Sequence, residues 1–239
     1  TLEKLKPGDV IEVPFGSRKE IGVVWNDIQN IDKKIKLKNI NKKIINFSIN
    51  KKMIQFIEWF STYNMSSKGM VLKMCLGNTK NLTKIEKENF SHGNFKKKKY
   101  FLNKEQKLAL KDLSKFGEKY NVTVLQGVTG SGKTLVYFER IKQILSQQKQ
   151  VLVLLPEIFL TNQFEERFTN FFGLKPAIWH SKITPKNKRK IWQGVNKNQV
   201  NLVIGARSSL FLPFKKLGLI IVDEEHDPSY KQDEGLIYN

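Results

Sequence analysis

The stretch GVTGSGKT, residues 127–134, fits the pattern G-x-x-x-x-G-K-[ST] and stands between an apolar run and a helical pattern. Glycines in such a loop let backbone N–H groups surround phosphates, while Lys133 reaches the terminal phosphates and the Thr134 hydroxyl ligates Mg²⁺. The start of the following helix adds a favourable dipole. We therefore predict an ATP site made of Gly127, Val128, Thr129, Gly130, Ser131, Gly132, Lys133 and Thr134.

Apolar runs alternate with helical patterns around this loop. We expect strands at 122–125, 151–155, 177–179, 202–204 and 219–222, and helices at 133–147, 160–170 and 186–195. Apolar strands separated by helices are typical of a parallel sheet covered on both faces. Residues 100–239 are thus predicted to form an α/β nucleotide-binding domain.

The run LIIVDEEH, residues 219–226, supplies the acidic partner of the loop. A carboxylate at the tip of an apolar strand can hold Mg²⁺, and its neighbour can polarise a water for attack on the γ-phosphate. Parallel sheets bind their ligands at this end of the strands. We predict that Asp223 and Thr134 are metal ligands and that Asp223, Glu224 and Lys133 are catalytic.

Three further segments carry weaker signals. Gln106, in FLNKEQ, precedes the phosphate loop by about 20 residues, and its amide could read the adenine edge. PEIFLTNQF (156–164) and GARSSLF (205–211) follow expected strands and offer small residues and hydroxyls that suit a phosphate backbone. Arg207 and Ser208 are the DNA-contact candidates in the second of these loops.

Composition points to a basic chain that acts on phosphates. The 239 residues carry 42 Lys and Arg against 22 Asp and Glu, a net charge of +20, which suits nucleic-acid binding. Abundant Asn and Ile also fit a genome-wide composition bias. The single cysteine, Cys75, and three histidines argue against a disulfide framework or a structural zinc site. No stretch reaches the roughly 20 apolar residues of a membrane span, so we expect a cytoplasmic protein.

The first 99 residues have a different pattern. Residues 9–13 and 21–25 read as strands joined by the turn PFG, which predicts a small β-rich domain over residues 1–50. Apolar spacing in 51–76 indicates two short amphipathic helices of a partial winged-helix-like segment. Residues 78–99, with the lysine run at 96–99, read as a linker.

Several strings together resemble the PriA family of replication-restart DNA helicases, in superfamily 2. They are GVTGSGKT, LLPEIFLTNQF, WHS, IGARSSLFLPF and, most specifically, VDEEHDPSYKQDEG. GDVIEVPFGSRKEIGVVW is similar to that family's 3′-DNA-binding domain, and FIEWFSTYNMSSKGMVL to the start of its winged helix. The resemblance implies a RecA-like first motor lobe at residues 100–239, binding ATP and Mg²⁺.

The resemblance also implies roles toward DNA and other proteins. Tyr230, Lys231 and Gln232 would lie in an aromatic-rich loop that senses single-stranded DNA, and Gly16 and Lys38 would line a pocket for a nascent 3′ end. Forked DNA, primosome proteins and single-strand-binding protein are the implied partners. Two departures from the family pattern are Asn162 in place of Pro and CLGN in place of Leu-Pro.

The family's second RecA-like lobe, arginine finger and cysteine-rich zinc module are expected beyond Asn239, so zinc ligands are absent from this chain. The leading expectation is the N-terminal portion of an ATP-dependent 3′ to 5′ DNA helicase that restarts stalled forks. The alternative is a non-catalytic fragment that binds ATP and DNA without turnover. A P-loop kinase or transporter ATPase would not explain DEEHDPSYKQ.

Overall fold

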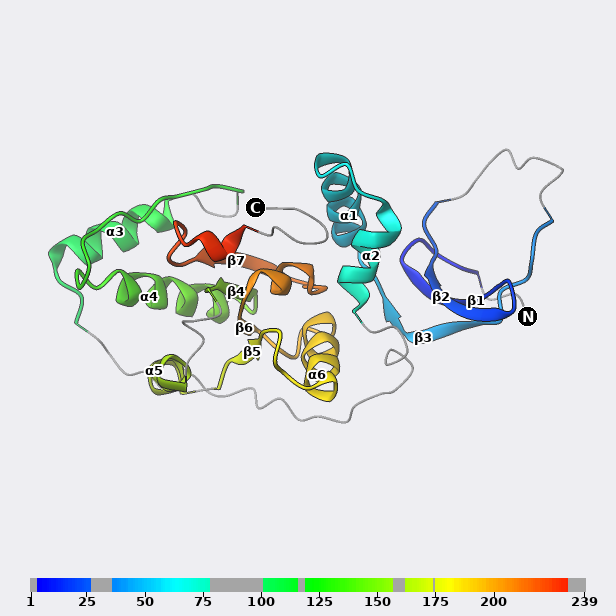
Figure 1. Cartoon of the computed structure of the whole chain (residues 1–239). Helices are drawn as coiled ribbons and strands as arrows, with labels where there is room; N and C mark the ends of the chain where they lie inside the picture. The colour runs from blue at the N-terminus through cyan, green and yellow to red at the C-terminus, as the bar shows by residue number, and fades with distance from the viewer. Residues whose placement is uncertain are drawn as a thin grey trace. The chain divides into compact units, whose positions relative to one another are not determined.

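The computed structural model describes residues 4–26, 36–77, 101–115, 119–156, 162–173 and 175–231. The chain divides into two compact units, residues 1–87 together with 231–239, and residues 88–230. Figure 1 labels the helices and strands of both. In the described part of the chain, no helix has the length and apolarity that crossing a membrane requires.

The first unit, here called the β-rich unit, contains a three-stranded antiparallel sheet in the order β2-β1-β3. Its strands are β1 (Asp9–Phe15), β2 (Arg18–Val23) and β3 (Lys42–Ser48). Gly16, with φ of 60°, turns the chain between β1 and β2, where Phe15 pairs with Arg18. The predicted hairpin is confirmed.

Two helices follow β3 in the same unit. Helix α1 (Lys51–Tyr63) begins at Asn50, whose side chain accepts a hydrogen bond from the Met53 N–H, and α2 (Lys68–Leu76) begins at Ser67. Capping of this kind satisfies N–H groups that have no partner within the helix. The helices bury apolar side chains that include Ile57 and Cys75. The two predicted helices are confirmed, and their assignment to a winged helix stays a prediction.

The second unit, here called the α/β unit, has a parallel sheet in the order β5-β6-β4-β7. Its described helices and strands are α3 (Lys104–Ser114), α4 (Lys133–Ser146), β4 (Gln150–Leu154), α5 (Asn162–Phe172), β5 (Ala177–Trp179), α6 (Pro185–Asn196), β6 (Leu202–Gly205), the 3₁₀ helix η3 (Arg207–Phe211), β7 (Leu217–Val222) and the 3₁₀ helix η4 (Pro228–Tyr230). The predicted α/β class with a parallel sheet is confirmed.

Helices α4 and α5 share one apolar core with the sheet. Phe138 of α4 lies 4.4 Å from Phe168 and 4.8 Å from Phe171 of α5, measured between ring centroids. Val153 of β4 and Ile204 of β6, both fully buried, belong to the same cluster. Tilted and edge-on ring pairs at these distances add to the stabilisation that burial gives. This core fixes α4, and with it the phosphate loop, against the sheet.

Gln150 connects three parts of the α/β unit from a fully buried position. Its Nε2 donates to the carbonyls of Val195 and Val200, at 3.0 and 2.8 Å. Its Oε1 accepts from the N–H groups of Lys215 and Lys216, at 2.8 and 2.9 Å. A buried amide with all these groups paired avoids the cost of unsatisfied polar atoms. It therefore holds the start of β7 beside β4.

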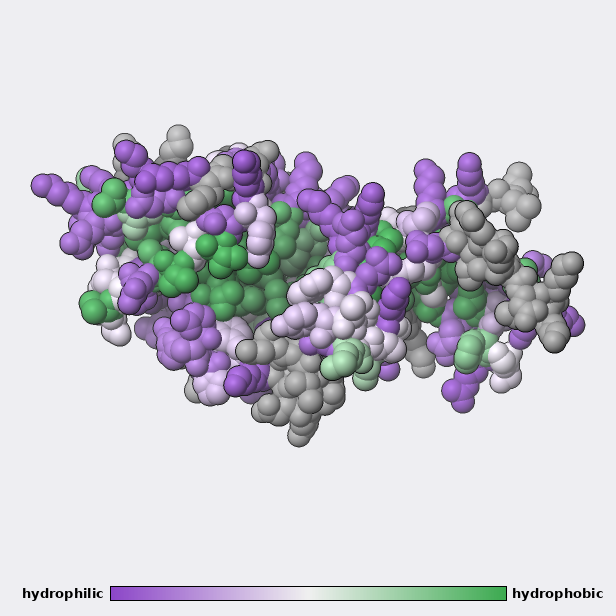
Figure 2. All heavy atoms as spheres, turned by 90° about the horizontal axis from the view of Figure 1, so that it is seen from above, coloured by the Kyte–Doolittle hydropathy of each residue, from purple (hydrophilic) through white to green (hydrophobic). Residues whose placement is uncertain are grey.

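The strand expected at 122–125 is not formed in the structure. Residues 119–128 have no strand pairing, and Val122 and Val124 are 73% and 82% exposed. An apolar run becomes a strand only when a neighbour completes its hydrogen bonds. On β7 itself, Ile220 and Val222 are nearly half exposed, and Figure 2 shows apolar residues reaching the surface of the α/β unit. The prediction of a strand at residues 122–125 was therefore wrong.

Candidate nucleotide site and its acidic loop

The phosphate loop leads directly into α4. Gly130 and Gly132 have φ of 80° and 82°, a left-handed region that glycine adopts without a steric penalty. A Cβ on Gly132 would collide with the side-chain amide of Gln106. Gly132 is also the N-cap of α4 and provides no capping side chain. The first N–H groups of α4 are consequently suited to bind an anion such as a phosphate.

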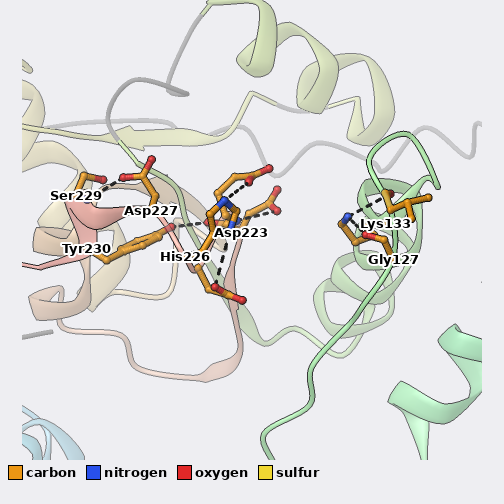
Figure 3. A network of polar contacts seen from close by, with 10 residues as sticks. Gly127, Lys133, Asp223, His226, Asp227, Ser229 and Tyr230 are labelled. Carbon is orange, nitrogen blue, oxygen red and sulfur yellow. Dashed lines mark hydrogen bonds and ion pairs between the residues drawn. The ribbon is translucent and has the colours of Figure 1, made fainter.

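Lys133 lies over this loop. Its ammonium donates to the carbonyl of Gly127 and, at 3.4 Å, to that of Val128, and Figure 3 shows it beside Gly127. The ammonium thus brings a positive charge to the phosphate loop. This arrangement suits the β- and γ-phosphates of a nucleotide.

Gln106 lies against the phosphate loop, and its side chain makes hydrogen bonds to the backbone of α3 and of that loop. It forms a capping box with Asn103, because each side chain accepts from the other's backbone N–H, at 2.8 and 3.0 Å. Its Nε2 donates to the carbonyl of Ser131 at 3.0 Å. Gln106 thus ties the start of α3 to the phosphate loop, and its reading of adenine stays a prediction.

Asp223 follows β7 and is fixed from several sides. Its backbone N–H donates to the Leu154 carbonyl at 3.1 Å, which continues the pairing of β7 with β4. Its Oδ1 accepts from the Glu224 N–H at 3.1 Å, and its Oδ2 accepts from the Tyr137 hydroxyl at 2.8 Å. The carboxylate orientation is therefore set by the neighbouring residue and by α4.

Glu224 has an unusual backbone for its residue type. Its φ is 51°, a left-handed value that is uncommon outside glycine and concentrates at functional sites. Its carboxylate is exposed and lies 3.6 Å from Nε2 of His226. Its predicted role as the residue that orients a water stays a prediction.

The acidic loop continues into the segment predicted to sense DNA. Tyr230 donates from its hydroxyl to the Asp223 carbonyl at 2.7 Å, and Arg207 donates to the Tyr230 carbonyl at 3.1 Å. Figure 3 shows the Tyr230 ring pointing toward Asp223. Burial first, then the negative charges of Asp223, Asp227 and Glu224, raise the pKa of the Tyr230 phenol, so it remains a donor. Two candidate DNA contacts are thereby joined to the acidic loop.

The remaining candidate residues lie as follows. Ser208 accepts from the indole N–H of Trp179 at 3.1 Å, which connects the loop after β6 with WHS. Lys231 is exposed, and Gln232 lies outside the described residues. Gly16 is exposed in the β1–β2 turn, and Lys38 is exposed in the segment before β3. Their roles toward DNA stay predictions.

The oxygen atoms of Thr134 and Asp223 fit a magnesium site. Asp223 accepts from the Tyr137 hydroxyl at 2.8 Å, and Thr134 stands three residues before Tyr137 on the same face of α4, so two hard oxygen ligands from separate elements lie close to one side chain. Mg²⁺ is usually bound by one or two protein oxygens together with phosphates and water. Among the described residues no group of three or more His, Cys, Asp or Glu side chains could hold a metal, which is consistent with that mode.

Comparison with known proteins places this site in a family. Residues 1–77 match the model of the 3′DNA-binding domain (3′BD) named for PriA, and residues 99–237 match the model described as type III restriction enzyme, res subunit. The replication restart protein PriA of Rickettsia conorii is 44% identical over 237 residues, which is 99% of this chain and 36% of the relative. The chain belongs to the PriA family.

Other PriA proteins agree with this assignment. The PriA of Helicobacter pylori is 45% identical over 138 residues, which is 58% of this chain and 22% of the relative. That of Bacillus subtilis is 46% identical over 117 residues, 49% of this chain and 14% of the relative. The chain thus spans about a third of the length of the PriA relative from Rickettsia.

Tyr137 is the site residue that the sequence analysis missed. It stands three positions after Thr134, so in a helix the two side chains share one face. That spacing could have placed Tyr137 near the metal ligands. Its partner Asp223 lies 86 residues further along the chain, and only the packing of α4 on the sheet brings the two together.

Proposed function

We propose that this chain is the N-terminal, ATP- and DNA-binding portion of an ATP-dependent 3′ to 5′ DNA helicase that recognises stalled or forked DNA and restarts replication. The observation that carries this proposal is the connection between the acidic loop and the predicted DNA-sensing segment. Tyr230 bonds the backbone of Asp223, and Arg207 bonds the backbone of Tyr230. A change in DNA contact at Arg207 or Tyr230 would therefore reach the nucleotide site through two hydrogen bonds.

In this proposal each side chain of the nucleotide site has a defined task. The loop N–H groups and Lys133 bind the phosphates, and Thr134 and Asp223 hold Mg²⁺, which neutralises charge on the β- and γ-phosphates. Glu224 orients the attacking water. The β-rich unit binds DNA, with Gly16 and Lys38 at a 3′ end, and primosome proteins and single-strand-binding protein are further partners.

Lys133→Ala tests the nucleotide site. Loss of one charge-assisted hydrogen bond corresponds to about 1.5–3 kcal/mol, so we expect about 10- to 150-fold weaker binding of a fluorescent ATP analogue. Lys142→Ala, which removes an ammonium paired with Glu139 elsewhere on α4, is the matched control and should bind normally. Equal binding by wild type and Lys133→Ala would refute the site.

Fork binding tests the DNA half of the proposal. A fork with a free 3′ hydroxyl on its nascent strand should bind more tightly than one whose 3′ end is blocked, because the bulk of the block would exclude it from a pocket at Gly16. Equal affinity for both forks would contradict the 3′-end pocket. Binding of ATP and forks without any stimulation of one by the other would instead favour a non-coupled binding fragment.

A further inference from the structure

Tyr137 follows the phosphate loop on α4, three residues after Thr134, and contacts Asp223 of the acidic loop. It lies in the first turns of α4, is only 6% exposed, and donates from its hydroxyl to Oδ2 of Asp223 at 2.8 Å. Thr134 stands three residues before Tyr137 on α4, so the two side chains share one face of that helix. Tyr137 therefore joins the acidic loop to the helix that carries Thr134, the other proposed magnesium ligand.

The phenol acts as a hydrogen-bond donor toward Asp223. Burial in the core beside Phe138 first, and then the negative charge of Asp223, raise the pKa of Tyr137. The Thr134 side chain has the opposite, smaller effect. The Tyr137 hydroxyl thus stays protonated and donates to Oδ2 of Asp223.

Asp223 gains a defined orientation from this contact. Its Oδ1 is already engaged by the Glu224 N–H, and its backbone is fixed to Leu154. Without the Tyr137 hydroxyl, Oδ2 would lose its hydrogen bond to α4, and the carboxylate would be held only through Oδ1. Groups that orient a metal ligand in this way commonly change metal affinity by about 10- to 100-fold when they are removed.

We propose that Tyr137 is a positioning residue for the magnesium ion of the nucleotide site, orienting the Asp223 carboxylate toward the ion that Asp223 and Thr134 would share. This inference rests on the proposed function. It adds Tyr137 to the residues of the phosphate loop and the acidic pair. It also implies that α4 positions the acidic loop relative to the phosphate loop.

Tyr137→Phe in the full chain tests the inference, because it removes the hydroxyl and keeps the ring that packs on Phe138. The measurement is binding of a fluorescent ATP analogue in EDTA and across a Mg²⁺ titration. We expect affinity in EDTA to stay within about twofold of wild type, while the half-saturating Mg²⁺ concentration rises by about tenfold or more. Mn²⁺, followed by electron paramagnetic resonance, should show the same shift with nucleotide present.

Tyr120→Phe, at a 93% exposed position of the same unit, is the matched control and should leave the Mg²⁺ titration unchanged. An unchanged or lower half-saturating Mg²⁺ concentration in Tyr137→Phe would overturn the inference. Equal losses of affinity in EDTA and in Mg²⁺ would also overturn it, because they would indicate a general packing role. Failure of the wild-type chain to bind nucleotide would overturn the proposed function as well, whereas the other outcomes concern Tyr137 alone.

Discussion

Several candidate residues of the α/β unit are joined by hydrogen bonds, whereas those of the β-rich unit, Gly16 and Lys38, lie exposed in connecting segments. Tyr137, Asp223, Tyr230 and Arg207 form one connected series of contacts. Gly16 sits in an open turn with nothing near the position of its missing Cβ. A connected site should respond sharply to single changes. A basic surface should instead respond in small, additive and salt-dependent steps.

Turnover should give the largest effect. Charge on the transferred phosphoryl group needs a cation, and an arginine finger is worth about 10³ to 10⁵ in rate. By family resemblance this arginine belongs to a second lobe. We expect a polypeptide of these 239 residues to hydrolyse ATP more slowly, by about that factor, than the same residues continued by the remainder of a PriA relative.

The measurement is steady-state phosphate release with and without forked DNA, for both polypeptides. Glu224→Gln in the longer protein is the control and should abolish release while sparing nucleotide binding. Strong DNA-stimulated release by the 239-residue chain would contradict this expectation. It would mean that the connected site already contains every catalytic group.

Removing a core ring should give the next largest effect and should show whether the two units unfold separately. Phe168 is fully buried and packs on Phe138, so Phe168→Ala should lower the unfolding free energy of the α/β unit by about 3–5 kcal/mol. Hydrogen–deuterium exchange resolved by peptide should accelerate in residues of that unit and stay unchanged in β1–β3. Uniform acceleration throughout would show that the units are coupled.

The sequence predicted the parts of the α/β unit that depend on local pattern. The phosphate loop, α4 and the apolar strands β4 and β7 all follow from residue spacing. The strand at 122–125 was expected for the same reason and is absent, because pairing depends on a neighbour that spacing does not reveal. The contact of Tyr137 with Asp223 could not be predicted from the sequence either, because it forms only when α4 packs on the sheet.

The β-rich unit was predictable to a lesser degree. The β1–β2 hairpin follows from alternation and the turn at Gly16, but β3 was not anticipated because Lys42, Lys43 and Asn46 interrupt its apolar pattern. In the α/β unit, the capping box of Asn103 and Gln106 was not anticipated, although Asn103 three residues before Gln106 fits that pattern closely; the adenine contact of Gln106 stays a prediction. In each case the missing information was which partner a polar residue meets.

DNA binding should show the smaller, distributed response of the β-rich unit. If lysines bind the phosphates, log affinity for single-stranded DNA should fall linearly with log salt, with a slope near −0.7 per phosphate contacted. Lys38→Ala should weaken binding only a few-fold and reduce the slope by about 0.7. Lys111→Ala, on α3 of the other unit, is the control. A flat salt response would exclude a phosphate-based surface.

The smallest effect should be the pH dependence of the β-rich unit through Asp9. Burial raises the pKa of this carboxyl, but the Lys43 ammonium at 2.9 Å and the Lys6 N–H outweigh burial and lower it overall. A carboxyl with a lowered folded-state pKa stabilises the fold above its unfolded pKa of about 3.9 and loses that contribution as pH falls through the folded value. The stability difference between wild type and Asp9→Asn should therefore be constant from pH 7 to about pH 5 and shrink below pH 4. Urea unfolding followed by amide NMR signals of β1 and β2 measures it, with exposed Glu20→Gln as control. If the difference in unfolding free energy between wild type and Asp9→Asn persisted unchanged to pH 2, the contribution of Asp9 would come from packing and not from its charge.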